Sequence, residues 1–178
     1  METQNSESQV VTTRSTGFRY GLILAVISIA YFLILTISGI GMQGPAGYVS
    51  YIFVGVILFL AHKYYKENGN GFMSIGQGVG ISFWTSLVSS VISSIFTYIY
   101  IKFVDSGFMD AIKDKQMEEM QKQGMSDEQM EQAMKFAGAF TSAEAILIFG
   151  IVGGIIVGII IGLVISLFTK NTNPDAEI

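Results

Sequence analysis

The chain has 178 residues, of which 51% are hydrophobic and 13% are charged, whereas about a quarter of the residues of an average soluble domain are charged. The net charge is −4 and the basic residues form no cluster, so the composition indicates a membrane protein and disfavours nucleic-acid binding. The absence of cysteine excludes disulfides, thiolate metal sites, a cysteine nucleophile and cysteine-linked lipids.

The first uncharged stretch, residues 20–62, is too long for one helix across a hydrocarbon core of about 30 Å. Several glycines and Pro45 lie near its middle, and this turn chemistry divides the stretch in two. We therefore predict a polar N-terminal tail at residues 1–19, a first membrane span at 20–40 and a second at 46–61.

His62 is the single histidine of the chain and follows the second predicted span directly, next to Lys63. A metal site needs several ligands. The sequence therefore favours an interfacial residue over a metal ligand at this position.

Two further uncharged stretches predict a third span at residues 75–101 and a fourth at 143–168, with a polar C-terminal tail at 169–178. Thr141 and Glu144 have the spacing of a capping box that would start the fourth helix. Apart from Glu144 at the edge of the fourth span, no Asp, Glu, Lys, Arg or His lies inside any predicted span, which argues against a pump or a proton-coupled transporter.

Residues 102–142 form the one sizeable polar segment, which we predict to be an extramembrane amphipathic helical hairpin. Gly124 ends its first helix, and Ser126 with Gln129 makes a capping box for its second. Its acidic residues are predicted to form a solvated face. Its apolar stripe is either an adaptable, methionine-rich surface for a partner or the face on which the two helices pack. The residues of this candidate partner surface are Met109, Ile112, Met117, Met120, Met130, Met134 and Phe140.

The third and fourth spans each carry a ladder of small residues at a spacing of four, the pattern of a glycine zipper. Small residues let helix backbones approach closely, and helix pairing in lipid depends on such packing. We expect the glycine ladder of the fourth span to pack within one chain against a neighbouring span, for which the serine ladder of the third is one candidate. A homodimer face and a glycine-lined conduit are alternative interpretations. The predicted helix-packing residues are Gly78, Ser82, Ser86, Ser90 and Ser94 in the third span and Gly150, Gly154, Gly158, Gly162 and Ser166 in the fourth.

An even number of spans places both termini on the same side of the membrane. Basic residues near the first two spans, among them Arg19, Lys63 and Lys66, favour the cytoplasm for that side. The hairpin is then expected on the opposite side.

Three short segments resemble the bacterial domain-of-unknown-function-4199 family, and the similarity extends over residues 18–170. The first is residues 71–77 (GFMSIGQ), which follow a predicted turn. The second is residues 96–105 (FTYIY, then FVD), at the end of the third span. The third is residues 124–129 (GMSDEQ), between the two predicted helices of the hairpin. Ile75 departs from the pattern, which leads us to expect a phenylalanine two residues before Gln77. The resemblance implies a bacterial inner-membrane protein and supplies no activity, substrate or functional residue.

The sequence thus predicts an all-α integral membrane four-helix bundle with an amphipathic helical hairpin between the third and fourth spans. We expect a non-enzymatic scaffold or partner-binding protein that presents the hairpin at the membrane surface. The alternative is a small passive transporter or channel subunit lined by the serine-rich third span and the glycine-rich fourth. No catalytic, metal or cofactor site is predicted. The expected partners are the lipid bilayer and either a second copy of the chain or another membrane protein, with no nucleic acid.

Overall fold

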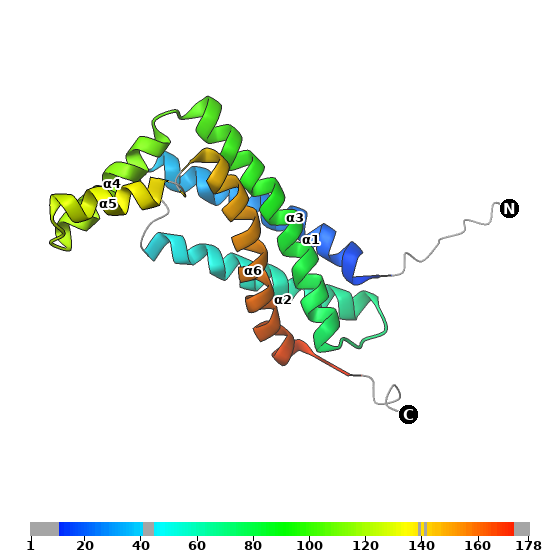
Figure 1. Ribbon diagram of the computed structural model, residues 1–178. Helices are drawn as coiled ribbons and strands as arrows, with labels where there is room; N and C mark the ends of the chain where they lie inside the picture. Colours follow the sequence, from blue (N-terminus) through cyan, green and yellow to red (C-terminus); the bar gives the residue numbers. More distant parts are fainter. Residues whose placement is uncertain (1–10, 41–44, 139, 141, 173–178) are drawn as a thin grey trace. The chain divides into compact units, whose positions relative to one another are not determined.

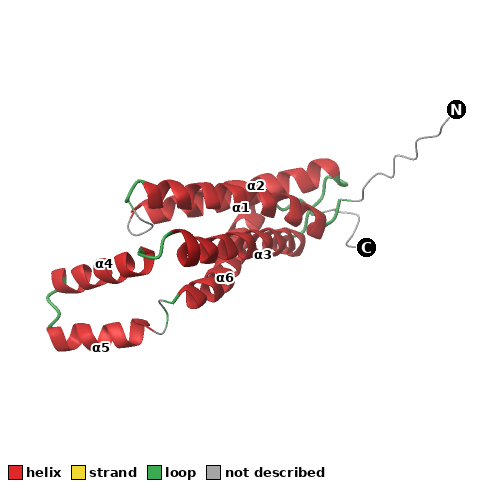
Figure 2. Ribbon diagram, turned by 90° about the horizontal axis from the view of Figure 1, so that it is seen from above, coloured by secondary structure: helices red, strands yellow, loops and turns green. Residues whose placement is uncertain are grey.

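A computed structural model of the chain describes residues 11–40, 45–138, 140 and 142–172. The all-α architecture predicted from the sequence is confirmed within these residues (Figures 1 and 2). Four helical stretches are long and apolar enough to cross a membrane: α1, α2, α3 together with the π-helical turn η1, and α6. The elements are α1 (Thr13–Ile37), α2 (Pro45–Asn68), α3 (Ile75–Ile99), η1 (Tyr100–Val104), α4 (Phe108–Lys122), α5 (Asp127–Gly138) and α6 (Ala143–Thr169).

The chain divides into two compact units, and the sequence boundaries between them fall within α3 and α6. The first unit comprises residues 1–89 and 155–178, with α1, α2, the start of α3 and the end of α6. The second unit comprises residues 90–154, with the rest of α3, η1, the α4–α5 hairpin and the start of α6.

The helix α1 begins at Thr13, inside the segment predicted to be a polar tail. The reason is a reciprocal capping box, in which Thr12 Oγ1 accepts from the Ser15 backbone N–H and Ser15 Oγ accepts from the Thr12 N–H, each at 3.0 Å. These bonds satisfy backbone donors that would otherwise be unpaired at the helix start. A helix can therefore extend beyond the apolar stretch that defines the span.

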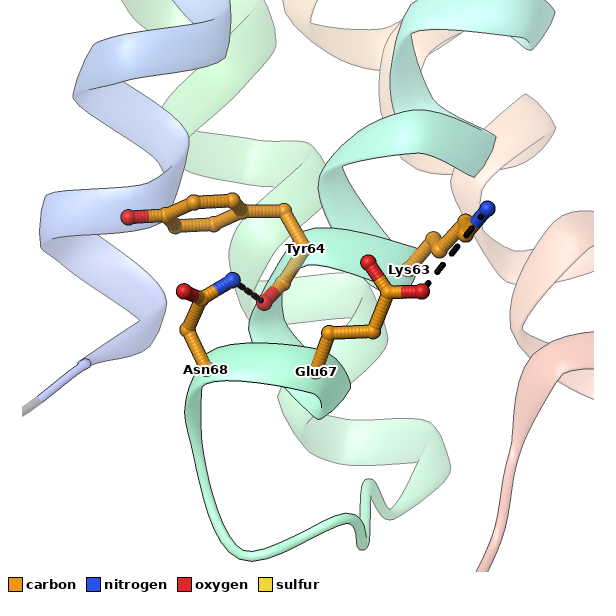
Figure 3. A network of polar contacts seen from close by, with 4 residues as sticks. All are labelled: Lys63, Tyr64, Glu67 and Asn68. Atoms are coloured by element: carbon orange, nitrogen blue, oxygen red, sulfur yellow. Dashed lines mark hydrogen bonds and ion pairs between the residues drawn. The ribbon is translucent and has the colours of Figure 1, made fainter.

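The helix α2 likewise continues to Asn68, past the predicted end of the second span. Its last two turns carry charges on an exposed face, where Lys63 Nζ lies 3.7 Å from a Glu67 carboxylate oxygen (Figure 3). Asn68 Nδ2 donates to the Tyr64 carbonyl at 3.0 Å and helps to close the helix. The boundary of the apolar stretch was thus a poor guide to the helix end, because backbone hydrogen bonds continue into the polar region.

Turn and capping signals in the sequence explain the other helix boundaries. The predicted Ser126–Gln129 capping box is confirmed, with Ser126 N–H donating to Gln129 Oε1 at 2.9 Å. Gly124 has a φ of +76°, a conformation that favours glycine and ends α4 as predicted. Thr141 lies outside the described residues, and Ser142 Oγ accepts from the Ala145 N–H at 3.0 Å at the start of α6.

The helices α1 and α2 pack side by side in the first unit (Figure 2). Tyr31 of α1 joins them, because its hydroxyl donates to the Ala46 carbonyl at 2.6 Å and its ring meets Phe53 edge-on at 5.2 Å. Apolar residues such as Leu24 and Leu58 are buried here.

Most of the buried α3 residues are small and polar, with Ser82, Thr85 and Ser86 at most 4% exposed, although the apolar Ile81 is also fully buried. Large apolar side chains are instead exposed, including Ile37 at 79% and Phe168 at 84%. This distribution suits a bilayer, because lipid solvates the exposed apolar side chains, while small buried residues let helices pack closely.

Candidate functional site: a buried histidine network and an anchored hairpin

The two predicted ladders lie against one another as antiparallel rungs in the first unit. A Cβ atom added to Gly158 would collide with Ser86, and one added to Gly162 would collide with Ser82. At the third rung the order is reversed, since a Cβ added to Gly78 would collide with Ser166. Each step of four residues along α6 therefore matches a step of four in the opposite direction along α3.

The second unit repeats the arrangement with two rungs. A Cβ atom added to Gly154 would lie 2.8 Å from Ser90 Cβ, and one added to Gly150 would lie 2.6 Å from Ser94 Oγ. Gly153, next in the chain to Gly154, has no such neighbour within 4 Å. The close approach thus requires glycine at the ladder positions and not at the adjacent one.

A third close contact, between α1 and α3, did not emerge from the sequence analysis. A Cβ atom added to Gly17 would collide with Trp84, and one added to Gly21 would lie 2.7 Å from Val88 Cβ. The signal was present, since Gly17 and Gly21 have the spacing of a helix-pairing motif. It was missed because the predicted first span began only at residue 20.

His62 lies in a buried polar network that joins three helices of the first unit. Its ring is fully buried. From α2, Nε2 lies 2.9 Å from the Gly78 carbonyl oxygen and 3.2 Å from Ser82 Oγ, both on α3. Nδ1 lies 2.9 Å from Thr169 Oγ1 at the end of α6. The position of His62 beside Lys63 in the sequence gave no indication of this burial, because consecutive helix residues point to different faces.

The hydrogen-bond chemistry assigns the histidine tautomer. The Gly78 carbonyl can only accept, so Nε2 carries the proton in that bond. In the neutral ring Nδ1 is then an acceptor, so the single Thr169 hydroxyl proton is shared between Nδ1 and the Ile165 carbonyl oxygen, each 2.9 Å from Thr169 Oγ1. Ser82 Oγ also donates to the Gly78 carbonyl, at 2.9 Å.

The end of α6 is held to the first unit by further bonds close to His62. Lys66 Nζ, one turn beyond His62 on α2, donates to the Thr169 carbonyl at 2.8 Å. The negative end of the α6 helix dipole stabilises a cation at this position. Met73 and Asn171 then exchange two backbone hydrogen bonds, at 2.8 and 2.9 Å.

In the second unit, the predicted partner surface divides into residues that are half-buried and residues that are exposed. The helices α4 and α5 lie side by side (Figures 1 and 2), and neither has a fully buried residue. Five of the predicted residues are half-buried, whereas Met117 and Phe140 are 42% and 47% exposed. The sequence analysis did not select Phe136, which is 74% exposed. The five half-buried residues are Met109, Ile112, Met120, Met130 and Met134.

Aromatic rings contact one another at both roots of the hairpin, which are the segments where it joins η1 and α6. On one side the Tyr100 ring lies 6.5 Å from Phe96 and 6.4 Å from Phe108. On the other side the Phe140 ring lies 5.4 Å from Phe136 and 5.5 Å from Phe149. Between the roots, an ion pair of 2.8 Å joins Lys102 of η1 to Glu144 of α6.

Ion pairs also lie along the hairpin surface. Lys122 Nζ is 2.7 Å from a Glu118 carboxylate oxygen, and this hydrogen bond lowers the pKa of Glu118 and raises the pKa of Lys122. Across the described ranges of the chain, no three His, Asp or Glu residues lie close enough to hold a metal ion together.

Searches of curated proteins and of solved structures each found no match. Residues 19–171 match a family model described as a protein of unknown function, DUF4199. The match extends from α1 to the residues that follow α6, and so includes both the histidine network and the hairpin. The chain is therefore a member of the DUF4199 family, as the resemblance of its short segments led us to expect.

Proposed function

We propose that this protein is a non-enzymatic membrane scaffold that presents the α4–α5 hairpin to a protein partner at the membrane surface. The observation that carries the proposal is a contrast within the hairpin. The hairpin is held at both roots by aromatic contacts and by the Lys102–Glu144 ion pair. Large apolar side chains of the same hairpin are nevertheless exposed.

Short connections support a position of the hairpin close to the membrane. The helix α4 begins four residues after η1 ends at Val104, and α5 ends five residues before α6 begins at Ala143. Since η1 and α6 belong to membrane-spanning stretches, the hairpin roots stay near the membrane boundary. A surface held in this way loses little conformational freedom when a partner binds.

The chemistry of the exposed surface favours a protein partner over an anionic lipid surface. Phe136, Met117 and Met125 are 74%, 42% and 37% exposed. They lie in a segment, residues 102–142, that has five lysines and eight acidic residues. Its net negative charge opposes anionic headgroups and suits a partner whose apolar patch has a basic rim.

Site-specific photocrosslinking in intact cells tests this proposal. A photoreactive amino acid replaces Phe136, and the control replaces Ile148, a 58% exposed residue of the apolar α6. We expect one discrete protein adduct from position 136 and lipid adducts alone from position 148. The adduct at 136 should also disappear when Phe140 is changed to Asp, because the two rings form one surface. Lipid adducts alone at both positions would contradict the proposal.

The competing function is passive transport through the serine-rich third span and the glycine-rich fourth. The serines of the α3 ladder lie against α6 glycines within each unit, so this polar face is used for helix packing. We therefore favour the scaffold. Flux of small solutes into liposomes that contain the pure protein, above the flux into empty liposomes, would instead support transport.

A further inference from the structure

The α3–α6 ladder of the first unit does not by itself determine the register, that is, the position of α6 along the axis of α3. Its rungs recur every four residues, which corresponds to about one helical turn of 5.4 Å. After a slip of one turn Ser86 would face Gly162, and Ser82 would face Ser166. Small residues would still oppose small residues, so the ladder favours close packing without favouring one register.

The His62 network, by contrast, is satisfied in one register. Its ring contacts α3 through Gly78 and Ser82 and contacts α6 through Thr169. A slip of one turn would move Thr169 away from Nδ1. In one direction Ile165 would take its place, and Ile165 has no side-chain hydrogen-bonding group.

A lost hydrogen bond is costly here because the ring is fully buried, so water cannot replace the missing partner. A single buried polar residue sets the register of helix pairs in coiled coils by the same physics. Packed helices are also known to move past one another in steps of one turn.

We propose that His62 is a register catch. It holds α3 and α6 in one of several registers that their ladder permits, and its release allows α6 to move by one turn along α3. The Lys66–Thr169 and Met73–Asn171 bonds stabilise the same register at the end of α6. The contacts that carry this inference all lie in the first unit, and the inference does not depend on the function proposed for the hairpin.

A distance measurement between α2 and the end of α6 tests the catch. The chain lacks cysteine, so Glu67→Cys and Lys170→Cys, at two exposed positions, can carry spin labels without background labelling. With His62 intact, double electron–electron resonance between the two spin labels in lipid nanodiscs should give one narrow distance population. In His62→Ala, a second discrete population should appear, displaced by at most about one helical turn, 5.4 Å.

Two variants of Thr169 keep the test decisive if His62→Ala fails to fold. Thr169→Val preserves the volume but removes the hydroxyl, and it should also produce the second population. Thr169→Ser keeps the hydroxyl and should retain the single population. One unshifted population in Thr169→Val would overturn the catch. A broad, continuous distribution would also overturn it, because it would indicate general loosening and not a discrete step.

The single histidine allows an independent check. In protein labelled with ¹⁵N-histidine, the imidazole signals come from His62 alone. At neutral pH we expect the proton on Nε2, since the Gly78 carbonyl requires a donor. A proton on Nδ1 would mean that the bond to Gly78 is absent and that the catch does not exist as described.

Discussion

The first and second units both hold α3 and α6 together, but with different kinds of polar contact. In the first unit the contact is the His62 network, which is fully buried. In the second unit it is the Lys102–Glu144 ion pair, whose side chains are 41% and 56% exposed. Water can replace the partners of an exposed ion pair but cannot reach a buried ring. We therefore expect the first unit to be the stable anchor and the second to tolerate change.

The largest effect on stability is expected from disrupting the ladder, which is the contact that both units share. Gly154→Leu should destabilise the helix pair by about 1–3 kcal/mol or more, because the new side chain meets Ser90. Thermal unfolding in detergent, monitored by gel filtration, measures the loss of stability. Gly153→Leu is the matched control and should be nearly neutral, since an added Cβ there has no close neighbour within the described residues. Equal losses in the two variants would contradict the ladder geometry.

The next effect separates buried from exposed polar contacts on one helix. His62→Ala should lower the free energy of unfolding by about 1–3 kcal/mol, because it leaves buried polar partners without their bonds. Its neighbour Lys63 forms an exposed ion pair with Glu67, so Lys63→Ala should cost less than about 0.5 kcal/mol. Denaturant titration of both variants in the same detergent provides the comparison. A loss in Lys63→Ala as large as that in His62→Ala would argue against a special role for burial.

A smaller effect is expected at the root of the hairpin. Glu144→Gln should cost less stability than His62→Ala, because the pair with Lys102 is exposed to solvent. The difference from the unmodified chain should shrink as salt is raised, since salt screens exposed charges. Thermal melts at low and high ionic strength measure it. A large loss that is independent of salt would indicate that the second unit is as rigidly anchored as the first.

The smallest effect concerns pH and the hairpin surface. The Lys122 hydrogen bond lowers the pKa of Glu118 below its ordinary value of 4.5. Its contribution to stability is therefore present above pH 4.5 and is lost as the pH falls through the lowered value. The raised pKa of Lys122 means that the same pair also weakens when the pH rises through the lysine value. Carboxyl ¹³C shifts of the full chain, compared with those of Glu118→Gln, would identify the titration. A Glu118 midpoint at or above 4.5 would contradict the contact.

Much of the fold followed from local patterns. Charge-free stretches predicted the four membrane-spanning helices, and Gly124 with the Ser126–Gln129 capping box predicted the hairpin turn. The helix ends do not coincide with the predicted span ends, because the boundaries of apolar stretches reflect the membrane and not the hydrogen bonding of the backbone. Thus α1 begins before and α2 ends after the predicted spans.

The sequence by itself determined that this chain is an all-helical membrane protein of the DUF4199 family, with small residues where helices meet. Composition and short-range spacing carry that information, because insertion into lipid and helix formation depend on neighbouring residues. The tertiary structure alone decided which helices meet and at which register. It also decided that His62 is buried, because its partners are 16, 20 and 107 residues away along the chain. Contacts over such separations depend on how helices pack, and no local pattern specifies them.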